Sequence, residues 1–280
     1  MGLFDIFKKK ETESVQQTTP QKEPYLGDLI KKKETESVQQ TTLQKEPYFG
    51  DLNKTKEIYN LVKVPPSDRD ENWKIEFLSN LSSASFRCGD PQVIKGPDGF
   101  PYFQLFLPEP NKSFQCYVID RMQNDFLLES GFGVVIIQTG KQPDWVLSYG
   151  DILNLHLNKT FYTIGKTAFS REMKDEVIQK EEEIMIGQPS ETILPKATRK
   201  LLDSFLKMNG IKSPKVLLLM RHINGGEGVS QDIAFNILPE NFSSEAIYRS
   251  VMQTIAWYLP RHYSFVGVDE KTFGSGFMPL

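Results

Sequence analysis

The sequence predicts an α/β (α+β) fold, with two small α/β domains that contain mixed sheets and a disordered N-terminal arm in front of them. Three observations support this prediction. From residue 54 onward, short apolar runs typical of strands alternate with stretches of helical periodicity. Hydrophobic residues make up 39% of the 280 residues, whereas the first 53 residues are polar and repetitive. We therefore expect an arm over 1–53, a first domain over 54–165, a linker over 166–182 and a second domain over 183–280.

The arm contains a 23-residue segment that occurs twice in tandem, at 8–30 and 31–53. The copies differ only at three aligned pairs of positions: Pro20 and Leu43, Leu26 and Phe49, Ile30 and Asn53. The register extends beyond the copies as a shared pattern of apolar, Asp and Lys positions: Leu3, Asp5 and Lys8; Leu26, Asp28 and Lys31; Phe49, Asp51 and Lys54.

Lys, Glu, Gln, Thr and Ser dominate each copy, and proline interrupts both. Such a composition buries too little apolar surface to offset the entropy that is lost on ordering, so we expect 12–50 to be flexible. The duplication itself has two interpretations. Tethered copies raise the effective concentration of weak docking segments, or the duplication has no consequence.

The first ten residues, MGLFDIFKKK, place apolar side chains on one side of a short helix that is followed by three lysines. This layout is typical of interfacial anchors, and the run GLFDI is similar to the start of amphibian membrane-active peptides of the aurein type. Leu3, Phe4 and Phe7 are therefore candidate interaction residues. The segment either docks on the rest of the chain or makes weak contact with a membrane or a partner.

Charge and cysteine content narrow the classes of partner and compartment. Residues 1–57 hold ten Lys and ten acidic residues, which leaves 23 basic and 26 acidic residues in the rest of the chain. Neither part has the positive excess that attracts nucleic acid, so we expect no nucleic-acid partner. With two cysteines and no signal-peptide pattern, we expect a cytoplasmic protein, with a peripheral position at the inner face of the membrane as the alternative.

In the first domain, Trp73, Phe77 and Leu81 recur at helical spacing and predict a helix over 70–86. Apolar runs on either side of a Pro-Asp-Gly turn predict a hairpin. Ser113 is the expected N-cap of a second helix that ends at Gly131. Further elements are expected at 134–138, which resembles a buried strand, at 145–147 as a strand, and at 151–157 as a short helix or strand.

Two cysteines and one set of four polar or flexible residues are the candidate reactive groups of this domain. Cys88 lies between Arg87 and Gly89 in an expected loop and is the best candidate for a sulfurtransferase thiolate, although the sequence has no anion-cradling loop after it. Cys116 is expected to pack on an apolar helix face. Close together in sequence lie four polar or flexible residues for which we expect packing rather than catalysis: Tyr149, Gly150, Asp151 and His156.

The second domain is expected to begin with a strand at 184–186, a helix through 197–208 and a buried strand at 216–220. A glycine-rich hairpin then leads into a strand at 232–238. Ser243 or Ser244 caps a helix that is stopped by Pro260, and a strand at 263–268 and a final edge strand follow. The glycine-rich segment lacks a phosphate-loop pattern, and the histidines have no metal-ligand spacing, so we expect no cofactor and no metal.

Several segments of the second domain carry a family resemblance: IGQPSETILP at 186–195, the helix over 201–208, PKVLLLM at 214–220, DIAFNILPENF at 232–242 and the strand after Tyr258-Leu259-Pro260. On these residues the domain resembles the C-terminal domain of SseB-like (enhanced serine sensitivity) bacterial proteins. The first domain resembles the N-terminal domain of that family more loosely, through DGFPYFQLF and the strand after Gly131. The resemblance transfers no catalytic residue.

The favoured functional interpretation is a non-enzymatic, intracellular bacterial protein-binding or regulatory module with a protein partner. It predicts uncovered apolar patches near the linker or on the helix that carries Tyr248 and Trp257. Three alternatives remain open: an immunity-type protein that neutralises a toxin, an adaptor that the N-terminal segment recruits to a membrane or scaffold, and a sulfurtransferase-like enzyme that uses Cys88.

Overall fold

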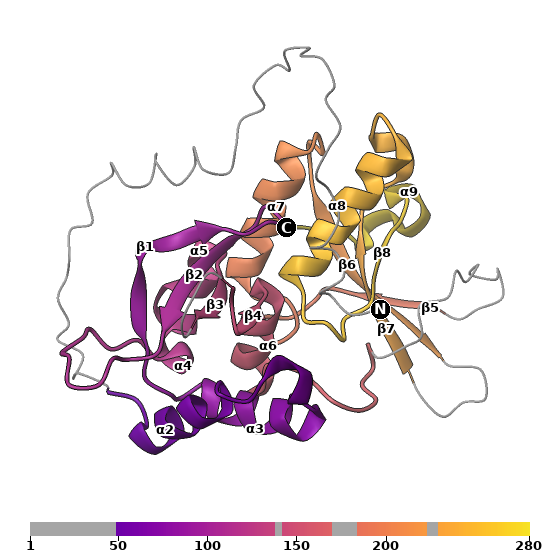
Figure 1. Cartoon of the computed structure of the whole chain (residues 1–280). Coiled ribbons are helices and arrows are strands. Elements are labelled where there is room, and N and C mark those ends of the chain that lie inside the picture. The colour runs from indigo at the N-terminus through magenta and orange to yellow at the C-terminus, as the bar shows by residue number, and fades with distance from the viewer. Residues whose placement is uncertain (1–48, 138–141, 170–183, 223–228) are drawn as a thin grey trace, which may run out of the picture. The chain divides into compact units, whose positions relative to one another are not determined.

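A computed structural model describes residues 49–137, 142–169, 184–222 and 229–280 (Figure 1). The predicted arm up to residue 48 and most of the predicted linker, 170–182, lie outside the described residues. Tyr48–Leu280 is one compact unit. Its described residues form a four-stranded and a five-stranded sheet together with helices, which confirms the predicted α/β class with mixed sheets. Each predicted domain contributes one sheet, and the exact domain boundaries stay a prediction.

The first sheet has the strand order β1 (Arg87–Lys95), β2 (Pro101–Phe106), β3 (Gly133–Ile137) and β4 (Trp145–Leu147). β1 and β2 form the predicted antiparallel hairpin, and β3 pairs with β2 in parallel and with β4 in antiparallel. Every residue of β3 is buried. The continuous apolar run therefore forms an inner strand, as its composition predicts.

The helices of the first half are α2 (Leu52–Leu61), α3 (Glu71–Leu81), α4 (Ile119–Met122), a π-helical segment (Gln123–Leu127), α5 (Leu128–Ser130) and α6 (Tyr149–Asn158), with a short 3-10 turn at Pro66–Asp68. α3 confirms the predicted apolar stripe, because Trp73, Phe77 and Leu81 are its buried residues. The ambiguous segment at 151–157 is helical, because Ser148 and Asp151 form a capping box in front of it.

The predicted cap at Ser113 is wrong. The helix begins at Ile119, after Val118, which makes no side-chain cap. Before it, the chain is extended, because Phe86 and Tyr117 exchange two backbone hydrogen bonds of 2.9 and 2.8 Å. This pairing across 31 positions overrides the local capping preference. Cys116 consequently lies outside any helix, which corrects the expected apolar helix face.

The second sheet has the strand order β5 (Ile184–Gly187), β6 (Lys215–His222), β7 (Val229–Phe235) and β8 (Phe265–Gly267), and β9 (Met278–Pro279) also pairs with β6. β6 and β7 form the predicted hairpin, and β8 is parallel to β7. The final strand of the predicted series is confirmed as β9, which lies antiparallel to the start of β6.

Two longer helices, α7 (Lys196–Met208) and α8 (Glu245–Tyr258), lie along this sheet (Figure 1). Ser244 caps α8, since its hydroxyl accepts a hydrogen bond of 3.3 Å from the backbone of Ile247. Short helical turns complete the second half: η4 (Pro239–Asn241), α9 (Glu270–Phe273) and η5 (Gly274–Gly276).

One hydrophobic core joins the two halves of the unit. The hydroxyl of Tyr149 on α6 lies 2.9 Å from the Thr198 hydroxyl on α7. The indole of Trp257 on α8 stacks on Phe100, with ring centroids 4.1 Å apart, and donates a 3.1 Å hydrogen bond to the Tyr102 hydroxyl. Side chains of the second half therefore complete the core of the first.

Candidate functional site

β5 lies at the edge of the second sheet and is the first candidate for a binding surface. Within the described ranges it pairs only with β6, so no described strand covers its other side. Met185 and Ile186 are 39% and 42% exposed. The strand has no lysine, proline or bulge, the features that usually protect an exposed edge. We use the term β5 edge for Ile184–Gly187.

The sheet face next to the β5 edge carries a second, smaller apolar cluster. Successive strand residues point to opposite faces, and the residues that point away from α7 and α8 form a small separate cluster. Its fully buried members, as far as the chain is described, are Leu217, Leu219 and Ala234. The C-terminal segment covers them with two half-buried rings, Phe273 and Phe277. Ile184 of the β5 edge packs against this cluster.

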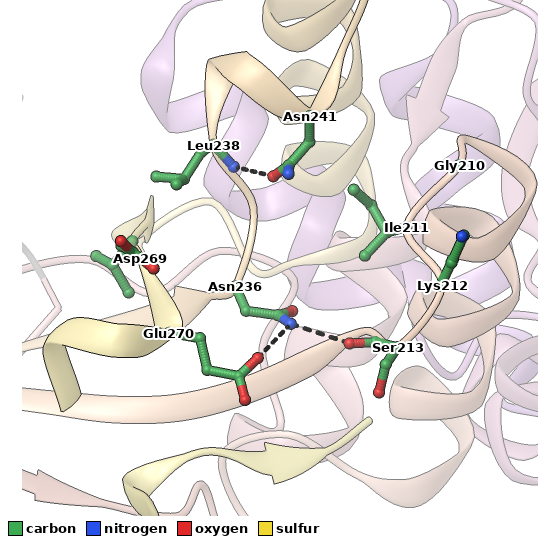
Figure 2. A pocket seen from close by; sticks show the side chains of 10 residues that line it. Gly210, Ile211, Lys212, Ser213, Asn236, Leu238, Asn241, Asp269 and Glu270 are labelled. Carbon is green, nitrogen blue, oxygen red and sulfur yellow. Dashed lines mark hydrogen bonds between the residues drawn. The ribbon is translucent and has the colours of Figure 1, made fainter. Parts of the chain in front are cut away.

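A pocket of about 400 Å³ lies where β7 and β8 end and β6 begins. Figure 2 shows that its lining side chains come from three segments that are far apart in the sequence. These residues are Gly210, Ile211, Lys212, Ser213, Asn236, Leu238, Asn241, Val268, Asp269 and Glu270. The pocket is wide and open to solvent.

The polar side chains at the pocket form hydrogen bonds with one another and with nearby backbone groups. Asn236 accepts a 2.7 Å hydrogen bond from the backbone of Lys215. It donates to the Ser213 carbonyl and to Glu270, at 2.9 and 3.3 Å (Figure 2). The Lys215 ammonium hydrogen-bonds Glu270 and lowers the pKa of that carboxyl. Asp269 caps α9. These hydrogen bonds hold the loops together at this end of the sheet. The arrangement of the side chains indicates no particular class of ligand.

Cys88 does not lie in the expected loop. It is half-buried in β1, where it pairs with Leu105, and the pairing of β1 with β2 shifts register between Cys88 and Val93. The side-chain amide of Gln92 donates to its sulfur at 3.7 Å. Burial, and then the hydrogen bond to Cys88, raise the pKa of Tyr117 to about 12.

α6 carries the predicted set Tyr149, Gly150, Asp151 and His156. Within this set, Asp151 has a structural role. Its carboxylate is fully buried and accepts two hydrogen bonds from Arg261, at 2.7 and 2.8 Å, and one from the backbone of Ser148, at 2.9 Å. The Arg261 guanidinium also lies 4.4 Å from the centre of the Tyr162 ring. This bidentate pair fixes the segment after α8 to the start of α6.

Trp257 and Tyr248 lie on α8, but they do not form an uncovered patch. Trp257 is only 9% exposed, because its ring is enclosed by aromatic side chains of both halves. This burial corrects the expectation of an uncovered surface at Trp257. Tyr248 is half-buried beside Phe242, with ring centroids 5.8 Å apart. The other predicted interaction residues, Leu3, Phe4 and Phe7, lie outside the described residues.

The sequence predicted apolar patches near the linker or on the helix with Tyr248 and Trp257, but it did not identify the β5 edge. The run Ile184-Met185-Ile186 has the same composition as a buried strand, and its exposure follows from the order of strands in the sheet. Arg261 was not singled out either. A basic residue directly after the helix-ending proline was the available signal, but its buried partner lies 110 positions earlier.

No group of three or more His, Cys, Asp or Glu side chains within the described ranges is placed to hold a metal ion. Among the same residues, no helix combines the length and the apolar character that crossing a bilayer requires. No family model, curated protein or solved structure matches this chain.

Proposed function

We propose that this protein is a non-enzymatic protein-binding or regulatory module of the SseB-like type and that it binds its partner through the β5 edge. The observation that carries the proposal is the exposure of Met185 and Ile186 on a strand whose outer side no described strand covers. An extended segment of a partner adds to such an edge through main-chain hydrogen bonds, and alternate side chains give specificity.

The small apolar cluster on the sheet face beside the β5 edge supports the same proposal. A partner strand beside β5 extends the sheet and lets its side chains continue the cluster around Leu217, Leu219 and Ala234. Burial of Ile186 removes further apolar area from water, at about 25 cal/mol per Å². The partner is therefore a protein with an extended, partly apolar segment.

Three aspartates have structural roles, which is consistent with a binding module. Asp51, Asp70 and Asp151 cap helices, and Asp151 also holds Arg261. Toxin neutralisation is one form that such binding takes, and no particular contact favours it over other protein partners.

Affinity capture from the source cell with the full chain as bait tests the proposal. The double variant Met185→Lys, Ile186→Lys places two charges on the β5 edge. Ile164→Lys is the matched control, because Ile164 is 81% exposed and lies outside β5. We expect the wild-type and control baits to retain one protein in a nearly equimolar amount. We expect the double variant to retain at least about tenfold less of that protein.

Equal thermal midpoints of the three baits establish that the charged strand still folds. Retention of the same protein by the double variant contradicts the proposal. So does recovery of a small molecule in place of a protein, because that result favours an enzyme or a ligand-binding protein.

A further inference from the structure

The outer side of β6 carries β9 as well as β5. β7 pairs with β6 over Val216–His222, so β5 and β9, which pair with residues of the same stretch, both lie on the other side of β6. Both strands are antiparallel to β6 and therefore run in the same direction, end to end. We use the term composite edge for Ile184–Gly187 together with Met278–Pro279.

Side-chain and backbone contacts hold β9 in line with β5. Gly276, in the turn before β9, lies directly against β5, because a Cβ there would be 2.5 Å from the Cδ1 of Ile186. The Arg199 guanidinium on α7 donates to the sulfur of Met278 at 3.8 Å. As far as the chain is described, β6 is the only strand that pairs with β5 or β9. The outer side of the composite edge is therefore available for a further strand.

The composite edge is longer than β5 alone. Together β5 and β9 extend along β6 from Lys215 to Arg221, which is seven residues, whereas β5 pairs with only four. Seven residues of strand span about 23 Å, at about 3.3 Å per residue. A strand that matches the whole edge is thus about seven residues long, which is within the usual range of strand lengths.

The side chains of the composite edge are apolar on both faces of the sheet. Ile184, Ile186 and Pro279 point to one face, because they pair with alternate residues of β6. Met185 and Met278 point to the opposite face, where α7 and α8 lie. An added strand meets apolar neighbours on both of its faces, so apolar residues fit at successive positions, as in a strand that is buried on both sides.

The charged side chains of β6 whose contacts the structure describes already have partners of opposite charge. Lys215 forms an ion pair with Glu270, and Arg221 lies 3.3 Å from the Asp232 carboxylate. A charged residue in an added strand would lose water beside apolar side chains and would gain no opposite charge from Lys215 or Arg221. The edge therefore favours a segment without charged residues.

We propose that the composite edge binds a partner segment of about seven uncharged, mainly apolar residues in extended conformation. This inference rests on the proposed function and extends the binding site from β5 to β9. Main-chain hydrogen bonds to the edge hold the segment, and its side chains pack beside the methionines on one face and the isoleucines on the other. Proline within the segment weakens binding, because it removes a main-chain donor.

A library of random twelve-residue peptides, displayed on phage and selected on the full chain, tests this proposal. Counter-selection on the variant Met185→Lys, Ile186→Lys removes peptides that bind elsewhere. We expect the enriched peptides to share a run of about seven uncharged residues without proline. Fluorescence anisotropy of synthetic copies then measures the affinity for wild type and variants.

Pro279→Lys is the variant that tests the contribution of β9. Pro279 is exposed, and a lysine there places a charge at the far end of the composite edge, so we expect at least about fivefold weaker peptide binding. Pro66→Lys is the matched control, because Pro66 is an exposed proline in the first half of the unit, and it is expected to bind like wild type. Equal thermal midpoints exclude unfolding as a cause.

The outcomes separate this inference from the proposed function. If the double variant in β5 loses the peptides and Pro279→Lys does not, the role of β9 is overturned and the proposed function stands. Peptides that bind the double variant as tightly as wild type contradict both. A selection that enriches no uncharged run, or one of only four residues, also overturns the inference.

Discussion

The two sheets share one order of elements but differ in how their apolar residues are covered. In the first half, α3 is followed by the hairpin β1–β2, a helical stretch and then β3 in parallel beside β2. In the second half, α7 is followed by the hairpin β6–β7, by α8 and then by β8 in parallel beside β7. The two halves therefore repeat the same arrangement of helix, hairpin, helix and parallel strand.

The difference lies in the strands that are added to this arrangement. β4 is added beside β3, and β2 and β3 keep nearly all their residues buried. In the second half, β5 is added beside β6, and none of its four residues is buried. The added strand β4 buries Leu147 and exposes Val146 at 37%, whereas β5 exposes two adjacent apolar side chains, so the proposed binding surface lies in the second half.

The largest expected effect comes from placing a lysine in each of the two sheets and comparing the loss of stability. Val135 in β3 is 4% exposed, so Val135→Lys buries an unpaired ammonium group and is expected to lower the free energy of unfolding by more than about 4 kcal/mol. Met185→Lys in β5 is expected to change it by less than about 1 kcal/mol. Urea denaturation of both variants measures the difference, and equal losses contradict the contrast.

Trp257→Ala tests whether the two halves share a core, because this side chain of the second half completes the core of the first. Loss of a buried Trp ring is expected to lower the free energy of unfolding by about 3–5 kcal/mol. Ile247→Ala is the control on the same helix, where a 44% exposed side chain is expected to cost less than about 1 kcal/mol. A loss at Trp257 no larger than that of the control shows that the two halves do not share a core.

The pair between Arg261 and Asp151 gives a smaller effect. Arg261→Ala leaves the fully buried Asp151 carboxylate with its helix-capping contacts alone, at an expected loss of about 1–3 kcal/mol. Arg249→Ala removes the exposed pair with Glu245 on α8, at an expected loss below about 0.5 kcal/mol. Denaturation curves compare the two, and similar losses contradict the structural role of the Arg261 pair.

The smallest effect is the dependence of stability on acid. Burial lowers the pKa of His156 in the first half and of His262 in the second. The unfolded chain, with an ordinary histidine pKa near about 6.5, then binds protons more readily than the folded chain as the pH falls. Stability from these groups is therefore full above that pH and decreases below it. We expect His156→Gln, His262→Gln to flatten the fall of the thermal midpoint between pH 7 and 5, and an unchanged slope contradicts this.

The elements that could be predicted from the sequence are those whose signals are local. The stripe of α3, the turn between β1 and β2 and the cap at Ser244 each lie within a few residues, and the structure confirms them. The predicted cap at Ser113 was wrong because a bridge between Phe86 and Tyr117 keeps that stretch extended. A pairing between distant residues leaves no local mark in the sequence.

The candidate site was harder to predict for the same reason. Exposure of Met185 depends on the place of β5 in the sheet, and burial of Trp257 depends on the approach of Phe100 from the other half. Both side chains are apolar and both lie in apolar runs. Composition identified the residues that can form an interface, but only the packing shows which of them stay exposed.

Hydrogen exchange of the full chain, free and bound to the protein captured from the source cell, shows whether the partner binds the β5 edge. We predict that the amides of Ile184–Gly187 become protected in the complex, because a partner strand pairs with the outer side of the β5 edge. Protection confined to the first sheet or to α2, with no change in exchange over Ile184–Gly187, would contradict it.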